Sequence, residues 1–466
     1  MANADGLHRK AKDAGQFEDL LDGSYMSFGL SDSWCRGMTS DMSDGTNEVY
    51  YALFQNDQGQ KLYQYAYNPE LSLKPEKELT VYTLYDQATI NQAATLFGKK
   101  HPDTMVSVHV ACADTDDKEA ETQRNRLMTS LAAGDGEDVI VLSGLDDNAL
   151  AKKGVLMDLS DIVTPMEENG ELLQAIVDGE KAADGKQQIL PVRFALPLLL
   201  SKEKRASEMT DLAALAKAAE QTDGSLLGTF TGEDLVETFA PYFMPDIIKD
   251  KQLDTEKLRT VLQELQTIAA HSDLIEKHKK GERASNEWDL PSTMQAALCQ
   301  ISGFNDAMFD LAIINLVKGD YTSFENAYIP TVEIGVNANT KQADLAKEFA
   351  AFVMSREVQD GDFYDGFPVN KESLHMQVNL DRSNYAAYTT IEGADGQEIG
   401  LDIEQIKAAD ADRLETICES LSQKTMQDAK VLEELEKAVP AYLLGRQSLD
   451  DTISKIQDGV KIYLAE

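Results

Sequence analysis

Short apolar runs alternate with amphipathic stretches along the first part of the chain. Residues 79–84, 105–110 and 138–142 are rich in β-branched and other apolar side chains, which predicts three strands. Between them, residues 86–101 and 118–132 place apolar side chains at helical spacing, which predicts two helices. Strands and helices that alternate in this way predict βαβ units and a parallel sheet.

Two extended segments divide the rest of the chain. Residues 188–200 (QILPVRFALPLLL) are apolar with two prolines, which favours an edge or crossover strand. Mostly helical patterns follow, and residues 328–340 are extended again before a predicted helix at 342–355. Residues 402–466 predict two or three amphipathic helices. This order predicts two α/β lobes joined by hinge strands, with a cleft between the lobes.

The amino-terminal 75 residues follow a different pattern. Residues 48–54 and 61–67 are aromatic and β-branched with period two, and Asn56 to Gly59 form a turn signal between them. We predict a β-hairpin that needs a second sheet to pack on. Pro75 and the charged residues after it mark a linker.

Composition excludes several classes of function. The formal net charge of -38 disfavours binding to nucleic acids and to anionic lipid surfaces. No run of about 18 apolar residues is present, so we expect no membrane-spanning helix. The four cysteines form no C-x-x-C pair, the six histidines have no ligand-pair spacing, and we expect neither a metal nor a cofactor.

Catalytic motifs are also absent from the sequence. It has no G-x-S-x-G, H-E-x-x-H or P-loop pattern, so we predict that the chain is not an enzyme. Paired carboxylates could run glycoside hydrolysis, but 81 acidic residues make chance pairs uninformative. The acidic residues 113–118 lack the glycine and closing glutamate of a calcium loop, and we interpret them as a solvated loop.

Four segments, in order, resemble the extracellular solute-binding proteins of ABC importers. They are ELTVYTLYDQATINQAATLFGKKHPD, LAAGDGEDVIVLSGLDDNALAKKGVLMDLSDIV, IPTVEIGVNANTKQADLAKEFAAFVMSREVQ and GFPVNKESL. The resemblance implies the type 2 periplasmic-binding-protein fold. Lobe 1 would comprise residues 78–190 and 331–375, and lobe 2 residues 195–328 and 376–466. The hairpin segment resembles the last strands of a β-propeller blade, which makes residues 1–75 either part of a propeller-like domain or an edge hairpin of the lobe.

The corners that follow the first and third predicted strands are the candidate ligand site. Ligands of open α/β sheets lie beyond the carboxyl ends of the strands. Tyr85 and Asp86 follow the first strand, and Ser143, Gly144 and Asp146 follow the third. The two aspartates have a second interpretation as helix N-caps.

Sugars are bound by aromatic faces together with carboxylates, because the sugar C–H face is apolar and the hydroxyls need acceptors. Trp288, in the polar-flanked sequence NEWDLP, is the foremost aromatic candidate. For the other aromatic candidates core packing is the competing interpretation; they are Tyr242, Phe304, Tyr364 and Phe367.

The resemblance implies a monomeric protein that captures a small ligand, with sugars favoured, in an inter-lobe cleft by hinge closure. Its partners would be the transmembrane subunits of an ABC permease. The alternatives are a secreted carbohydrate-active hydrolase and a ligand-sensing module for a signalling partner. The first residues resemble no signal peptide, so either the protein is cytoplasmic or its export segment lies outside this sequence. The resemblance favours the second option, an extracellular lipoprotein anchored at the cell surface.

Overall fold

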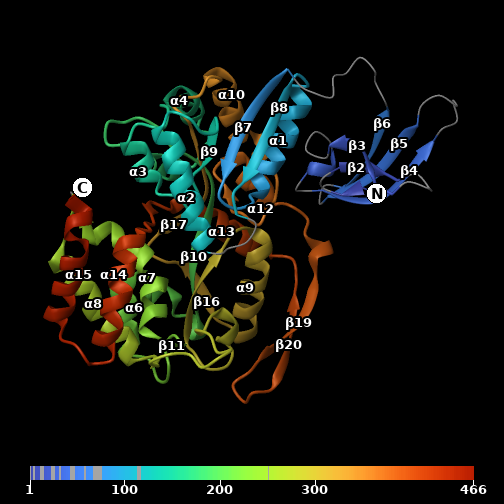
Figure 1. Ribbon diagram of the computed structural model, residues 1–466. Helices are drawn as coiled ribbons and strands as arrows, with labels where there is room; N and C mark the ends of the chain where they lie inside the picture. Colours follow the sequence, from blue (N-terminus) through green and yellow to red (C-terminus); the bar gives the residue numbers. More distant parts are fainter. Residues whose placement is uncertain are drawn as a thin grey trace. The chain divides into compact units, whose positions relative to one another are not determined.

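The chain folds into two compact units, which exchange segments along the sequence (Figure 1). The computed structural model describes residues 2–3, 6–10, 15–22, 27–30, 33–41, 48–56, 59–66, 76–112, 117–249 and 251–465. Unit 1 comprises Met1–Phe194 and Thr331–Asp381, and unit 2 comprises Ala195–Pro330 and Arg382–Glu466. Two long strands belong partly to each unit; they are β10 (Leu190–Ser201) and β17 (Ala327–Val336). We call them the crossing strands.

The amino-terminal part of unit 1 consists of two small antiparallel sheets. The strands of the first are β1 (Ala2–Asn3), β2 (Gly6–Arg9) and β3 (Glu18–Asp22), and those of the second are β4 (Trp34–Asp41), β5 (Val49–Asn56) and β6 (Gly59–Ala66). Strands β5 and β6 are the predicted hairpin; Tyr67 and two turn residues lie outside the described residues. The sheets share one small core that includes Leu7, Phe28, Phe54 and Tyr65, so the hairpin does pack on a second sheet.

The main sheet of unit 1 confirms the predicted parallel βαβ arrangement. Strand β7 (Lys77–Thr83) lies between β8 (Thr104–Val110) and β9 (Val139–Val141) and is parallel to both. The carboxyl-terminal part of β17 pairs with β9 in the antiparallel direction, and β18 (Phe367–Pro368) pairs with the start of β10. The fold is therefore α/β, as predicted, but the sheet is mixed and not wholly parallel.

Helices cover this sheet because their apolar faces have helical spacing. Helix α1 (Ala88–Lys100) buries Ile90 and Phe97, and the Phe97 ring contacts Phe349 of α10 (Ala343–Val353) edge to face at 5.3 Å. The remaining helices of the unit are α2 (Asp117–Ala132), α3 (Asp147–Lys152), α4 (Ser160–Glu168), α5 (Gln174–Asp178), α11 (Arg356–Gln359) and α12 (Lys371–Val378).

Unit 2 is rich in helices around one large apolar core. The helices are α6 (Leu212–Ala219), α7 (Gly232–Ile247), α8 (Thr255–Ala270), α9 (Phe304–Val317), α13 (Ala408–Ser420), α14 (Ala429–Leu443) and α15 (Leu449–Ala465). Leucines, valines and phenylalanines of α6, α7, α8, α14 and α15 share this core. The last three helices confirm the prediction for the carboxyl-terminal tail.

Short strands complete unit 2. Strands β15 (Ala296–Ile301) and β16 (Asp320–Ser323) pair with the carboxyl-terminal half of β10, and β21 (Gln423–Lys424) pairs with the start of β17. The other pairs are β11 (Thr229–Phe230) with β14 (Asp273–Leu274), β12 (Ile248–Lys249) with β13 (Gln252–Leu253), and β19 (Ala387–Glu392) with β20 (Glu398–Ile403). Among the described residues, no helix is both long and apolar enough to cross a membrane.

Candidate ligand-binding site

The strand order creates a switch point at β7. The chain passes from β7 through α1 to β8 on one side, and then returns through α2 to β9 on the other side of β7. In open α/β sheets, such a reversal leaves a crevice outside the carboxyl ends of the strands, where ligands bind. Both corners predicted from the sequence, after β7 and after β9, lie at these strand ends.

The structure brings the two corners into contact. Gly144 has φ +76°, and a β-carbon there would lie 3.5 Å from Tyr85 Cε2 and 3.1 Å from Leu84 Cδ2. Tyr85 is half-buried, and the Thr83 hydroxyl donates to its carbonyl at 2.5 Å. Glycine is favoured here because the backbone is left-handed, and because Leu84 and Tyr85 of the other corner lie beside the position that a β-carbon would take.

Hydrogen bonds fix the second corner in place. The Ser143 hydroxyl donates to the Thr331 carbonyl of β17 at 2.7 Å. The Gly144 carbonyl accepts from Arg124 Nε of α2, also at 2.7 Å. The Ser143 oxygen keeps acceptor capacity for a ligand hydroxyl. The sequence gives no sign of the role of Arg124, since this residue does not stand in a pattern that indicates one.

Asp86 is not the N-cap of α1, and the prediction that it caps this helix was wrong. The N-cap is Gln87, which makes no side-chain capping bond. The Asp86 carboxylate accepts from Asn91 Nδ2 at 2.7 Å, while the Thr89 amide donates to Asp365 at 2.8 Å. A carboxylate from a distant segment therefore takes the helix-terminal amide that Asp86 would have capped. Asp86 itself is exposed at the corner.

Asp146 is an N-cap. Its carboxylate accepts from the Ala149 amide at 2.8 Å, at the start of α3. The capping interpretation of this residue is confirmed, and the amide of Ala149 occupies an oxygen of its exposed carboxylate.

The five aromatic candidates fall into two groups. Tyr242, Phe304 and Phe367 are packed inside the cores of their units, and burial strongly raises the pKa of the Tyr242 hydroxyl. Tyr364, in contrast, is 70% exposed on the segment before β18. Trp288 is half-buried in unit 2, and its ring centroid lies 6.4 Å from that of Phe309. Only Tyr364 and Trp288 of the five offer ring surface to a ligand in this conformation.

One group of carboxylates has the spacing of cation ligands. Single oxygens of Asp147, Glu180 and Glu333 lie within 4.8 Å of one another, and Glu180 and Glu333 are buried. Carboxylate oxygens of this kind suit Ca²⁺ or Mg²⁺. In a chain with 81 acidic residues, however, such a cluster does not by itself define a metal site.

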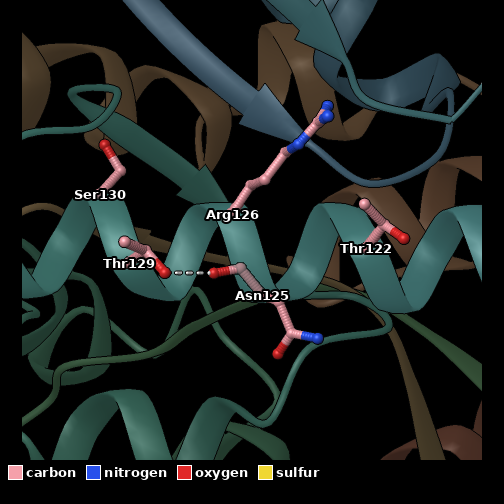
Figure 2. Close-up of a pocket in the computed structure, with 5 residues that line it drawn as sticks. All are labelled: Thr122, Asn125, Arg126, Thr129 and Ser130. Carbon is pink, nitrogen blue, oxygen red and sulfur yellow. Dashed lines mark hydrogen bonds between the residues drawn. The ribbon is translucent and has the colours of Figure 1, made fainter.

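A shallow hollow of about 540 Å³ lies on the polar face of α2 (Figure 2). Its lining residues recur at helical spacing; they are Thr122, Asn125, Arg126, Thr129 and Ser130. Figure 2 shows the Thr129 hydroxyl bonded to the Asn125 carbonyl, at 2.8 Å. A hollow bounded by one helix leaves a ligand open to solvent on its other sides, and it contains none of the predicted site residues.

Residues 83–360 match the sequence pattern of the family described as "Bacterial extracellular solute-binding protein". No curated protein matches the chain. Solved structures that are similar include the sugar-binding protein MalE from Xanthomonas citri, with 14% identity, a TM-score of 0.56, and coverage of 83% of this chain and 97% of that chain.

Two further structures match with similar coverage. A sugar transporter from Rhizobium etli in an open conformation has 14% identity and a TM-score of 0.53, over 82% of this chain and 99% of the other. An ABC substrate-binding protein from Listeria monocytogenes, solved with cycloalternan, has 15% identity and a TM-score of 0.53, over 84% and 99%. At such low identity, the likeness shows a shared fold.

Proposed function

Because the chain belongs to the bacterial extracellular solute-binding protein family, we propose that it captures a small carbohydrate outside the cell for an ABC importer. The observation that carries the proposal is the contact between Tyr85 and Gly144, which joins two polar corners at the switch point of the sheet. The sugar ligands named for similar structures, such as cycloalternan, favour carbohydrates over other solutes.

The proposed site binds a sugar without covalent chemistry. The apolar face of a sugar ring would lie against Tyr85, and its hydroxyls would donate to the exposed Asp86 carboxylate and the Ser143 oxygen. Gly144 would contact the ligand through its exposed backbone, beside the ring of Tyr85. Tyr364 and Trp288 are the further aromatic surfaces that we propose for the ligand.

Capture would follow from bending at the crossing strands. A ligand favours one conformation only by the difference between its affinities for the two conformations. The chain changes units at Phe194–Ala195, at Pro330–Thr331 and at Asp381–Arg382. The first two changes fall within the crossing strands, and they are the proposed hinge points. A closed, ligand-bound form would then be recognised by the permease subunits.

Several features of the proposal extend beyond the family itself. We propose that the protein is not an enzyme, that it acts as a monomer, and that it is anchored at the cell surface. We also propose residues 1–75 as part of a propeller-like domain, since their two small sheets have a core of their own. A carbohydrate-active hydrolase and a sensor for a signalling partner are the competing functions.

A thermal-shift screen tests the proposal. The panel comprises glucose, maltotriose, xylotriose, single amino acids, a dipeptide and spermidine. A ligand at about 100 times its Kd stabilises the folded state by about 2.7 kcal/mol, which raises the Tm by several degrees. We expect a shift with one class of sugar, and chromatography should recover that sugar unchanged. A shift only with an amine or a peptide would contradict the proposal that the ligand is a carbohydrate. Breakdown of the sugar would contradict the proposal that the chain is a binding protein and not an enzyme.

A further inference from the structure

A fully buried arginine lies directly before the chain leaves unit 1. Arg193 of β10 is 0% exposed, and the unit boundary falls after the next residue. Burying a guanidinium is costly unless its donors are bonded and its charge is compensated. Arg193 Nη1 has no hydrogen-bond partner among the described residues. Burial of this side chain therefore costs more free energy than burial of an apolar residue of similar size.

The other donors of Arg193 join two segments that are far apart in sequence. Nε donates to the Thr89 hydroxyl of α1 at 3.0 Å. Nη2 donates to the carbonyls of Val358 and Gly361, at 3.2 and 3.1 Å. The guanidinium also lies 5.1 Å from the centre of the Phe363 ring. One side chain thus holds both the start of α1 and the loop at residues 361–366.

Thr89 and Asp365 close this network. The Thr89 hydroxyl accepts from Arg193 and donates to Asp365 Oδ1 at 2.9 Å, and its amide donates to Oδ2 at 2.8 Å. Gly366 follows with φ +137°, and a β-carbon there would lie 2.8 Å from Arg193 Cβ and 2.9 Å from the Phe194 nitrogen. The loop therefore lies directly on the crossing strand, with no room for a larger residue.

Both joined segments carry proposed ligand contacts. Helix α1 begins at Ala88, two residues after Asp86, and the loop carries the exposed ring of Tyr364. The second corner is tied in the same way, because Ser143 donates to Thr331, the first residue of β17 that belongs to unit 1. The proposed contacts are thus bonded to residues beside the hinge points.

We infer that Arg193 is the positioning residue of the ligand site, which fixes the spacing between the Tyr85–Asp86 corner and Tyr364 and ties both to the crossing strand. This inference rests on the proposed function. Arg193 does not touch the ligand; it acts through Thr89 and through the 361–366 loop. Lysine cannot replace it, because a single ammonium lacks the planar fork that reaches a hydroxyl and two carbonyls at once.

Two variants and one matched control test this role in the full chain. R193K keeps the positive charge and removes the planar guanidinium group. T89V removes only the hydroxyl that bridges Arg193 and Asp365. T452V makes the same exchange at a buried threonine of α15 in unit 2, whose hydroxyl also makes two hydrogen bonds. Amide hydrogen exchange is measured without ligand, and the Kd for maltotriose and xylotriose is measured by calorimetry.

We expect R193K and T89V to speed exchange at least tenfold at residues 88–92 and 358–366, and to weaken sugar binding at least tenfold. T452V should leave the exchange rates at these residues and the sugar affinity as in the wild type, even if it lowers the Tm as much as R193K or T89V does. Unchanged exchange at 358–366, or affinity no weaker than in T452V, would overturn the inference. If the wild type binds neither sugar, the proposed function fails for these sugars, and the exchange result alone decides whether Arg193 anchors the loop.

Discussion

The ring of Tyr85 occupies the space beside Gly144: a β-carbon at Gly144 would stand 3.5 Å from Tyr85 Cε2. The two residues are separated by two helices and two strands in the sequence, yet they meet where β7 and β9 end. The two corners therefore form one surface, and the proposed ligand would contact both corners at once.

Gly144→Ala should disturb this surface. Its left-handed backbone makes alanine cost about 1–2 kcal/mol, and the new methyl group would press on Leu84 and come into van der Waals contact with the ring of Tyr85. We expect a lower free energy of unfolding in urea and at least tenfold weaker sugar binding. Gly154→Ala is the control, since Gly154 has φ +70° with nothing within 4 Å of the new β-carbon. It should lose similar stability and keep its affinity; equal affinities in both variants would refute the role of the Tyr85–Gly144 contact.

Variants of Asp86 and Asp146 should have different effects, the first on ligand affinity and the second on stability. Asp86→Asn removes a proposed acceptor of sugar hydroxyls and keeps its shape, so affinity should fall about tenfold, which corresponds to ~1.4 kcal/mol. Its unfolding midpoint should stay close to that of the wild type. Asp146→Ala removes the bond to the Ala149 amide and should cost about 1 kcal/mol of stability. Calorimetry and urea unfolding of both variants check the pair, and wild-type affinity in Asp86→Asn would remove Asp86 from the site.

Glu325 should make the stability of the protein depend on pH. Burial, together with Asp211, Asp246 and Glu264, raises its pKa from 4.5 to about 7, although the Leu212 amide donates to it at 2.8 Å. Because the folded pKa lies above the unfolded one, the protonated form is favoured by folding. Its contribution is fully present below pH 4.5 and is lost as the pH rises through about 7.

Urea unfolding between pH 5 and pH 8 measures this effect. Glu325→Gln should flatten the fall in stability with pH, and at pH 8 it should be more stable than the wild type. Glu220→Gln, which removes an exposed carboxylate, should keep the wild-type slope. A wild-type slope in Glu325→Gln would show that another group is responsible.

Contact between the ligand and Trp288 can be detected by tryptophan fluorescence. The chain has two tryptophans, and Trp34→Phe leaves Trp288 as the only emitter. The half-buried indole should be quenched or shifted in emission when a sugar lies on its face. Saturating sugar that leaves the emission unchanged, under conditions where calorimetry detects binding, would exclude Trp288 from the site.

The sheet of unit 1 could be predicted because its strands and helices have clear and different periods. Leu79 and Val106 are in register on parallel strands, as the βαβ pattern requires. The predicted helix at 118–132 begins one residue earlier, at Asp117. The β19–β20 hairpin was not predicted, although its residues alternate around a turn sequence, GADG. Helix α9 was also missed, since its apolar residues do not gather on one face and give no amphipathic period.

The candidate site could be predicted only in part. The corners after β7 and β9 follow from the strand order, so Tyr85 and Ser143 could be named from the sequence. Phe304 and Phe367 were ambiguous, because an aromatic ring in a core and one in a ligand site have the same local sequence signal. Arg193 could not be found, since its partners Thr89 and Gly361 come from segments that only the folded chain brings together.

Isothermal titration of the wild-type chain tests the central claim most directly. The titrant is the sugar with the largest thermal shift in the panel, and the ligand is recovered afterwards for mass analysis. We expect saturable binding of one sugar per chain, recovered with unchanged mass, and at least tenfold weaker binding in Tyr85→Ala. Heat that continues with turnover, or no saturable binding for any sugar in the panel, would contradict the account of this protein as a carbohydrate-capturing binding protein.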